Sequence, residues 1–130
     1  MGSIWRPEIE DFIEAHDQAG NISKIRTPGF MHSREAGIEK LEEIISEAEE
    51  LEEPYELAAF YLRETVKKQP FSDGNHRTGI IIAKETLNEN NEEFKVSKIR
   101  TGDEIKDDMK WNLKTSTVQE IAEWIKTGEF

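Results

Sequence analysis

Apolar residues recur at helical spacing through most of the 130-residue chain. Proline fits the first turn of a helix, so Pro7 and Pro54 each predict a helix start, and the hydroxyl of Ser33 predicts another by capping. The apolar positions of these three segments are Ile9, Phe12 and Ile13, followed by His16; Ile38, Leu41, Ile45, Ala48 and Leu51; and Leu57, Ala58, Phe60, Tyr61, Leu62 and Val66. The third segment is apolar nearly all round, which is typical of a helix at the centre of a domain.

The second half of the chain continues the pattern in shorter pieces. A fourth helix is expected from about Arg77 to Leu87, ended by the polar run 88–91, and the segment 93–98 is expected to be extended. Thr101 with Glu104, and Thr117 with Glu120, fit capping boxes and predict two more helices.

One long connection separates the first two helices. Residues Ile22 to Met31 are broken by Pro28-Gly29, which predicts a loop, and a loop of about ten residues in so small a domain is often functional. We find no internal repeat and no linker. The sequence therefore predicts an all-α fold, a compact bundle of about six helices in which residues 1–130 form a single domain.

The chain carries 28 acidic and 17 basic residues, for a formal net charge of −11. This balance argues against direct nucleic-acid binding, because affinity for nucleic acid comes largely from Lys and Arg placed on phosphates. The Glu-rich helix faces are interpreted either as solvated surface or as a docking face for a basic partner. No apolar run reaches the about 18 residues of a membrane span. No secretory signal and no cysteine are found, so a cytoplasmic location is expected.

The segment from Gln69 to Thr78 gathers residues whose chemistry suits a phosphate. Gly74 leaves bare backbone just before a predicted helix, and the N-terminal N–H groups of a helix bind anions. Asp73 can either cap that helix or hold a divalent cation, and Arg77 can grip an anion through two parallel hydrogen bonds. The helix dipole disfavours a cation near an N-terminus, so an arginine there is better explained by an anion beside it. The pattern indicates a nucleotide phosphate site, with an ordinary surface turn as the plainer alternative.

The same segment resembles the signature of the Fic/Doc (Fido) family, His-Pro-Phe-x-Asp/Glu-Gly-Asn-Gly/Lys-Arg. In this chain it reads Gln69-Pro70-Phe71-Ser72-Asp73-Gly74-Asn75-His76-Arg77. The likeness is greatest to the short Doc (death-on-curing) toxins, which lack the second arginine that classical Fic proteins place at the position of Ile80. The resemblance implies the helical Fido fold.

The resemblance also implies a role for most positions of the segment. These roles are Mg²⁺ ligation for Asp73, phosphate binding for Gly74, Asn75, His76 and Arg77, catalysis for Arg77 and for the position of Gln69, and a structural role for Phe71. Asn75 is also expected to stiffen the loop. Residues 28–32 are expected to form a flap that aligns the target segment as an added strand.

The activity implied by the resemblance is a transfer from ATP, with Mg²⁺, onto a hydroxyl of a target protein. Doc-type toxins transfer phosphate and classical Fic proteins transfer AMP. A Doc-like protein is expected to be the toxin of a toxin–antitoxin pair, so an antitoxin partner is implied, with a translation factor as the first expectation for the target.

Two positions depart from the family signature. Gln69 stands where the family has its catalytic histidine, and a neutral amide cannot take a proton from the incoming hydroxyl, so activity is expected to be weakened or lost. His76 stands where Doc-type proteins have lysine and Fic-type proteins have glycine, and its side chain favours the Doc-like nucleotide orientation. The sequence leaves three interpretations open: a weakened Doc-like toxin, a non-catalytic nucleotide-binding regulatory module, and a purely structural helical domain.

Overall fold

The computed structural model describes residues 4–22 and 29–130, and over these residues the chain is all-helical. The helices of the described ranges are α1 (Ile9–Ile22), α2 (Arg34–Glu47), α3 (Pro54–Lys68), α4 (Asn75–Glu89), α5 (Val96–Ile99), α6 (Gly102–Asn112) and α7 (Val118–Thr127). The predicted all-α class is confirmed. The expectation of an extended segment over 93–98 is wrong, because the single turn α5 forms there. Phe94 and Val96 are both buried, so their alternation imitated a strand although the backbone turns between them.

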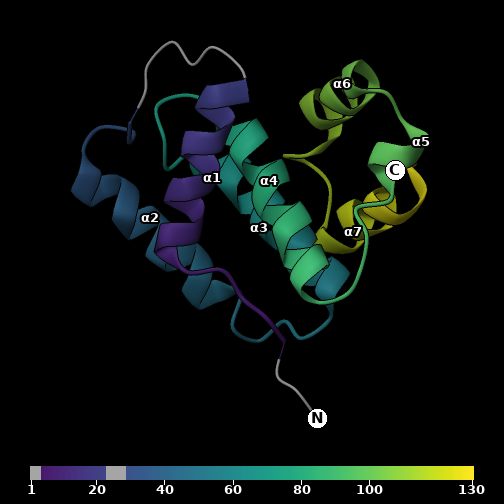
Figure 1. Cartoon of the computed structure of the whole chain (residues 1–130), viewed down its shortest axis with the longest axis horizontal. Helices are drawn as coiled ribbons and strands as arrows, with labels where there is room; N and C mark the ends of the chain where they lie inside the picture. The colour runs from purple at the N-terminus through teal and green to yellow at the C-terminus, as the bar shows by residue number, and fades with distance from the viewer. Residues whose placement is uncertain (1–3, 23–28) are drawn as a thin grey trace.

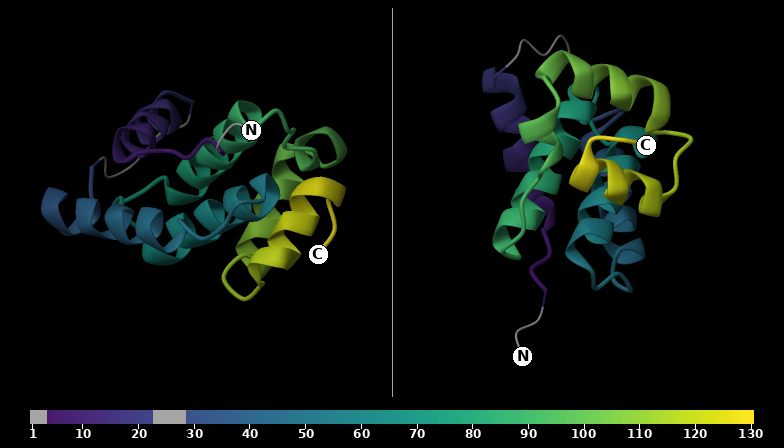
Figure 2. Two further views of the ribbon diagram at one scale, coloured as in Figure 1. Left: turned by 90° about the horizontal axis from the view of Figure 1, so that it is seen from below. Right: turned by 90° about the vertical axis from the view of Figure 1, so that its right-hand side faces the viewer.

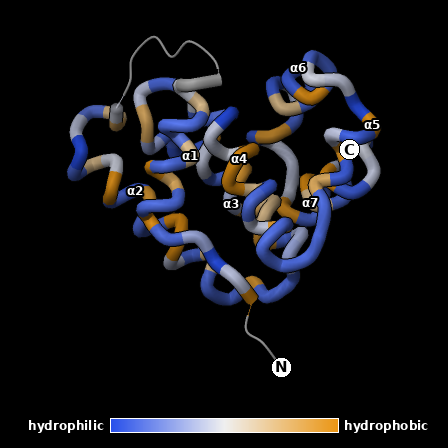
Figure 3. The backbone as a smooth tube through the Cα atoms, in the orientation of Figure 1, coloured by the Kyte–Doolittle hydropathy of each residue, from blue (hydrophilic) through white to orange (hydrophobic). Residues whose placement is uncertain are grey.

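Helices α3 and α4 run through the middle of the molecule, with α1 and α2 on one side and α5, α6 and α7 on the other (Figures 1 and 2). Two apolar clusters result. One joins α3 and α4 to α7 around Trp124, and the other joins them to α1 and α2 around Phe12 and Tyr61. Hydrophobic residues concentrate where α3, α4 and α7 meet (Figure 3). The central position predicted for the third helix is therefore confirmed.

The helix starts follow the local capping signals. Ser33 accepts a hydrogen bond from the backbone N–H of Ala36, and Thr101 and Thr117 each form a complete capping box. Helix α4 begins at Asn75 and ends at Glu89, two residues beyond the predicted helix at either end.

The apolar stripe predicted for α2 is rotated about the helix axis. Leu41 and Ala48 are buried as expected, whereas Ile38, Ile45 and Leu51 are only half-buried. The other buried positions of this helix and its C-cap are Gly37 and Ile44. The rotation has a local cause in Gly37, which is covered by an aromatic ring from the segment before the helix.

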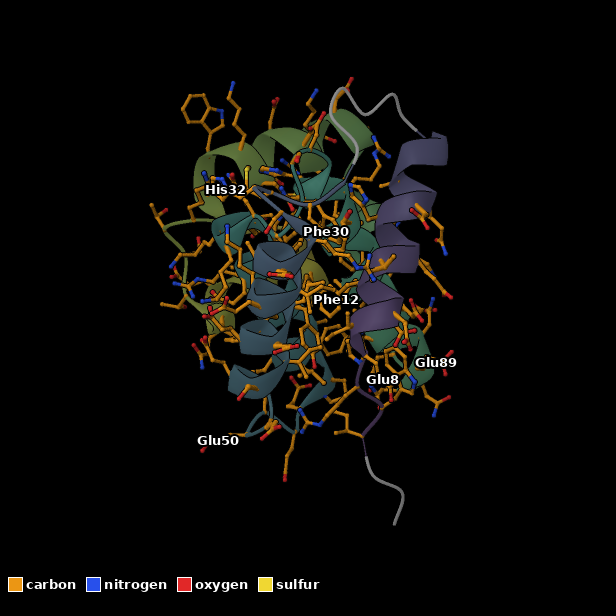
Figure 4. All side chains as sticks on the ribbon, turned by 90° about the vertical axis from the view of Figure 1, so that its left-hand side faces the viewer. Glu8, Phe12, Phe30, His32, Glu50 and Glu89 are labelled. Atoms are coloured by element: carbon orange, nitrogen blue, oxygen red, sulfur yellow. The ribbon has the colours of Figure 1, made fainter. Side chains whose placement is uncertain are left out.

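Phe30 lies directly on Gly37, between α1 and α2 (Figure 4). A Cβ atom added at Gly37 would lie 2.2 Å from Cδ1 and 2.7 Å from Cβ of Phe30, so no larger residue fits without moving the ring. Phe30 also stacks on Phe71, with ring centroids 5.2 Å apart. Gly37 thereby sets the position of the segment that precedes α2.

Asp108 fixes α6 against the C-terminal part of the chain. Its carboxylate accepts two hydrogen bonds from Arg100, of 3.1 and 2.8 Å, and one of 2.9 Å from the indole N–H of Trp124. A carboxylate that accepts from an arginine fork and an indole holds three segments in one arrangement. The position of α6 is thus set by contacts far from its own sequence.

None of the helices formed by residues 4–22 and 29–130 is long and apolar enough to cross a membrane.

Replacement of Gly37 by alanine is expected to destabilise the fold by about 1–3 kcal/mol, because the added methyl group overpacks the Phe30 site. Urea unfolding followed by circular dichroism measures this. The control is Gly102→Ala in α6, where a Cβ would meet nothing within 4 Å and alanine favours the helix. An unchanged or higher stability of Gly37→Ala would contradict the packing described.

Glu85→Gln is expected to stabilise the protein at pH 7. Burial raises the pKa of Glu85, and the negative charges of Asp11, Glu89 and Glu14, on the facing surfaces of α1 and α4, raise it further. A raised folded-state pKa means that the ionised form is disfavoured in the folded protein, so stability is lost as the pH rises through that pKa. The melting temperature of Glu85→Gln should exceed that of the parent at pH 7, and the gap should close near pH 4 and shrink in high salt. A gap independent of pH would rule out charge as its cause.

Candidate functional site

The motif loop, residues Gln69 to Gly74, joins α3 to α4 and begins and ends in left-handed backbone. Gln69 caps α3 with φ 49° and ψ 65°, and its N–H donates to the carbonyl of Thr65. Gly74 is the N-cap of α4 with φ 80° and ψ 15°. A glutamine in this region is uncommon and is strained by about 1–3 kcal/mol, a cost that surrounding structure must hold in place.

Asn75 holds the loop closed from inside. Its amide oxygen accepts from the N–H of Phe71 at 3.1 Å, and its amide nitrogen donates to the carbonyl of Phe71 at 2.8 Å. Both residues are buried, at 8% and 1% exposure, so these bonds are shielded from water. This geometry gives Asn75 the loop-stiffening role, while its contact with a phosphate stays a prediction.

Asp73 does not cap α4. Its Oδ1 accepts from the N–H of Gly74 at 2.8 Å, and the N-cap position itself is Gly74, which has no side chain to give. Helix α4 therefore starts without a side-chain cap, and its first-turn N–H groups are the ones on which an anion would rest. Arg77 and His76 follow in this first turn and are both exposed.

A cleft of about 730 Å³ opens at this helix start, lined mainly by residues of α4 and α6. Its lining residues are Asp73, Gly74, Asn75, His76, Arg77, Ile80 and Lys84 from the motif and α4, then Phe94, Gly102, Asp103, Ile105, Lys106, Met109 and Lys110. The volume lies within the range of small-molecule sites, about 300–1,000 Å³. The structure thus brings together all the predicted phosphate-binding residues and the predicted Mg²⁺ ligand. Gln69 is the one predicted site residue that does not line the cleft.

The cleft reverses the charge balance of the chain. Among the residues that the structure describes, four basic side chains, Arg77, Lys84, Lys106 and Lys110, line it together with two acidic ones, whereas the whole chain has 17 basic and 28 acidic residues. A positive cleft in a negative protein concentrates an anionic ligand at this point. The three lysines were not predicted as site residues from the sequence. Lys106 and Lys110 lie four residues apart on a predicted helix, and this spacing could have indicated a basic helix face.

His76 lines the cleft with an imidazole whose pKa is lowered. Partial desolvation lowers its pKa below the ordinary value of 6.5, and the positive charge of Lys114 lowers it further. His76 as a whole residue is exposed, so this desolvation is partial. At pH 7 His76 can offer a phosphate a hydrogen bond but no full positive charge.

The segment proposed as a flap lies beside the motif loop. Phe30 and Phe71 form an isolated antiparallel bridge, in which Met31 N–H donates to Pro70 and Ser72 N–H donates to Gly29, each at 2.9 Å. The Ser72 hydroxyl adds a bond of 2.8 Å to the carbonyl of Phe30. Pro28 lies outside the described residues, so the flap prediction is assessed only for Gly29 to His32.

His16 is a contact that the sequence analysis did not anticipate. The sequence places His16 at helical spacing with the apolar residues of the first helix and leaves open whether it could replace the missing base. In the structure its Nε2 lies 3.0 Å from the backbone oxygen of Asp73, and its ring stacks on Phe71. Lys40 of α2 also reaches the loop, with Nζ 3.5 Å from the carbonyl of Gln69. Both come from segments far away in the sequence, so spacing could not connect them to the loop.

The donor set fits Mg²⁺ that arrives on a nucleotide rather than a resident metal centre. Within the part of the chain that is described, no group of three or more His, Cys, Asp or Glu side chains could hold a metal ion. Mg²⁺ in nucleotide sites is typically held by one or two carboxylates, with phosphates and water supplying the other ligands. Asp73 beside an uncapped helix N-terminus meets that requirement.

A comparison with protein-family models matches the Fic/DOC family over residues 7–87. The match covers more than half of the chain, from α1 to α4, and includes the motif loop. Searches of curated proteins and of solved structures give no match.

Asn75→Ala is expected to cost about 2–4 kcal/mol of unfolding free energy, because it leaves the buried N–H and C=O of Phe71 without partners. Urea unfolding measures the loss. Asn112→Ala is the control, since Asn112 is half-buried and donates one bond, to the carbonyl of Asp108. A loss at Asn75 no larger than at Asn112 would show that the loop does not depend on these bonds.

Proposed function

The chain belongs to the Fic/DOC family, and on this basis we propose that it is a Doc-like toxin domain that binds Mg–ATP in the cleft. Its ancestral reaction is the transfer of phosphate, or of AMP, onto a hydroxyl of a target protein. In this chain the reaction is weakened or lost because Gln69 replaces the family's catalytic histidine.

One observation carries the proposal. The uncapped N-terminus of α4 opens into a cleft that holds both an acidic side chain for Mg²⁺, Asp73, and a cation for phosphate, Arg77. An exposed arginine in the first helical turn opposes the helix dipole, and a bound anion removes this conflict. A purely structural domain gives no reason for such an arrangement.

The residues of the chain then have distinct tasks. When bound, ATP would supply the group that is transferred, and its Mg²⁺ would partly neutralise the charge of the phosphates. Asp73 would orient the cation, the backbone N–H groups from Asn75 to Arg77 would hold phosphate oxygens, and the Arg77 guanidinium would stabilise charge that develops during transfer. Asn75 keeps the loop in shape, and His76 occupies the position that favours the Doc-like orientation and hence transfer of the terminal phosphate.

Glutamine at position 69 is expected to impair catalysis more than nucleotide binding. Loss of a general base typically lowers a rate by about 10²–10⁴-fold. Phosphoryl transfer depends mainly on positioning and charge stabilisation, so residual activity is compatible with glutamine there. Because Gln69 is not among the residues that line the cleft, we expect its replacement to affect nucleotide binding less than transfer.

Gln69 also favours a second candidate function, that of a regulatory module that binds a nucleotide without catalysis. A nucleotide-binding regulatory module needs the cleft but no base, and Gln69 with its side chain outside the cleft suits that function. The two candidates differ in whether restoring the histidine restores transfer.

By family resemblance, the biological setting of the first candidate is a toxin–antitoxin pair in the cytoplasm. An antitoxin protein would mask the site, and a translation factor is the first target to examine.

Gln69→His is expected to restore transfer by at least about 100-fold over the parent, which corresponds to the return of a general base. Parent and variant are incubated in cell lysate with Mg–ATP labelled on the α- or the γ-phosphate, and labelled protein is measured. A γ-label shows phosphate transfer and an α-label shows AMP transfer. Gln69→Asn is the matched control, because asparagine tolerates the left-handed backbone but supplies no base.

Two outcomes would change the assignment. If Gln69→His is folded, binds Mg–ATP and labels nothing, the regulatory module becomes the function. If neither protein binds Mg–ATP, the nucleotide proposal is wrong. Restored labelling that persists after Arg77→Ala is added to Gln69→His would contradict the role given to Arg77.

A further inference from the structure

His16 reaches the motif loop from α1 with its whole ring. The ring lies parallel to that of Phe71, at an interplanar angle of 4° with 4.0 Å between centroids, and Nε2 lies 3.0 Å from the carbonyl oxygen of Asp73. A carbonyl oxygen can only accept a hydrogen bond, so Nε2 carries the proton and donates it. His16 is 7% exposed, which shields this bond from water.

The peptide unit between Asp73 and Gly74 is therefore held at both ends. Its C=O accepts from His16, and its N–H donates to Oδ1 of Asp73 at 2.8 Å. This peptide leads into Gly74, the N-cap of α4, so its orientation helps to set the direction in which the chain enters the helix. Gly74 cannot fix that orientation, because glycine adopts positive and negative φ about equally readily. The observed φ of 80° is therefore held by hydrogen bonds around Gly74, including the bond from Thr78 N–H to the Gly74 carbonyl, and the bond from His16 to the adjoining carbonyl adds a restraint from outside the loop.

The stacked rings of His16, Phe71 and Phe30 restrain a second part of the loop, around Phe71. Phe71 contacts Phe30 as well as His16, and the guanidinium of Arg34 in α2 lies 5.4 Å from the centre of the Phe30 ring. The backbone of Phe71 is itself bonded on both sides by Asn75. Helices α1 and α2 thus hold the loop through stacked side chains, and His16 is the member that also bonds the loop backbone next to Asp73.

We propose that His16 is a positioning residue of the nucleotide site. It fixes the Asp73–Gly74 peptide, and through that peptide it orients the Asp73 carboxylate and the first N–H groups of α4. The inference rests on the proposed function for its ligand, but the restraint on the peptide can be measured without any ligand.

The test separates the hydrogen bond of His16 from its ring. His16→Phe keeps a stacking ring and removes the donor, whereas His16→Gln keeps an N–H donor of similar reach and removes the ring. His32→Asn is the matched control, because His32 is exposed and asparagine tolerates its φ of 65°. On the full chain with Gln69 present, three quantities are measured: the dissociation constant for Mg–ATP by calorimetry, the amide hydrogen-exchange rate of Gly74 by NMR, and the urea midpoint.

His16→Phe is expected to weaken Mg–ATP binding by about tenfold and to speed Gly74 exchange by a similar factor, the effect of losing about one buried hydrogen bond. His16→Gln is expected to stay closer to the parent than His16→Phe in both quantities, and His32→Asn to match the parent. A merely structural role would lower the urea midpoint of both His16 variants while leaving the dissociation constant of the folded protein unchanged.

Three other results would overturn part or all of this proposal. If His16→Phe matches the parent in Mg–ATP affinity and in Gly74 exchange, His16 does not position the site. Equal losses in His16→Phe and His16→Gln would assign the effect to the ring stack and overturn the role of the hydrogen bond. If the parent itself binds no Mg–ATP, the proposed function fails, and Gly74 exchange alone then decides whether His16 holds the peptide.

Discussion

The close approach of α3 and α4 is the constraint on which the site depends. Gly79 lies against Leu62, and a Cβ at Gly79 would lie 2.9 Å from Leu62 Cδ1 and 3.4 Å from its backbone oxygen. With the two helices this close, the short connection between them reverses through left-handed backbone at Gln69 and at Gly74. The shape of the motif loop thus follows from helix packing as much as from the loop residues, and the uncapped start of α4 is a consequence of that shape.

The two walls of the cleft have different origins in the chain. The α4 wall belongs to the part that the Fic/DOC family model matches, whereas α6 lies beyond that match. Asp108 holds α6 in place through Arg100 and Trp124, so the position of Lys106 and Lys110 at the cleft depends on a contact with the last helix.

The sequence by itself determined the local features of this protein. Helix caps act within three or four residues, so Ser33, Thr101 and Thr117 marked helix starts that the structure repeats. The apolar residues that occur nearly all round the third helix correctly predicted that this helix lies at the centre of the domain. The sequence also predicted that the residues of the signature segment lie together. Asp73 to Arg77 form a continuous stretch, and a helix start brings neighbouring residues to one point.

Only the tertiary structure decided what distant segments bring to that point. It rotated the buried face of α2, because the ring of Phe30 occupies the space beside Gly37. It placed Lys106 and Lys110 across the cleft from the motif, and it set His16 against the carbonyl of Asp73. No spacing rule links these residues, since their proximity results from packing of whole helices. The sequence therefore determines the chemistry of the loop, whereas the fold determines its shape, its charge environment and the contacts that hold it.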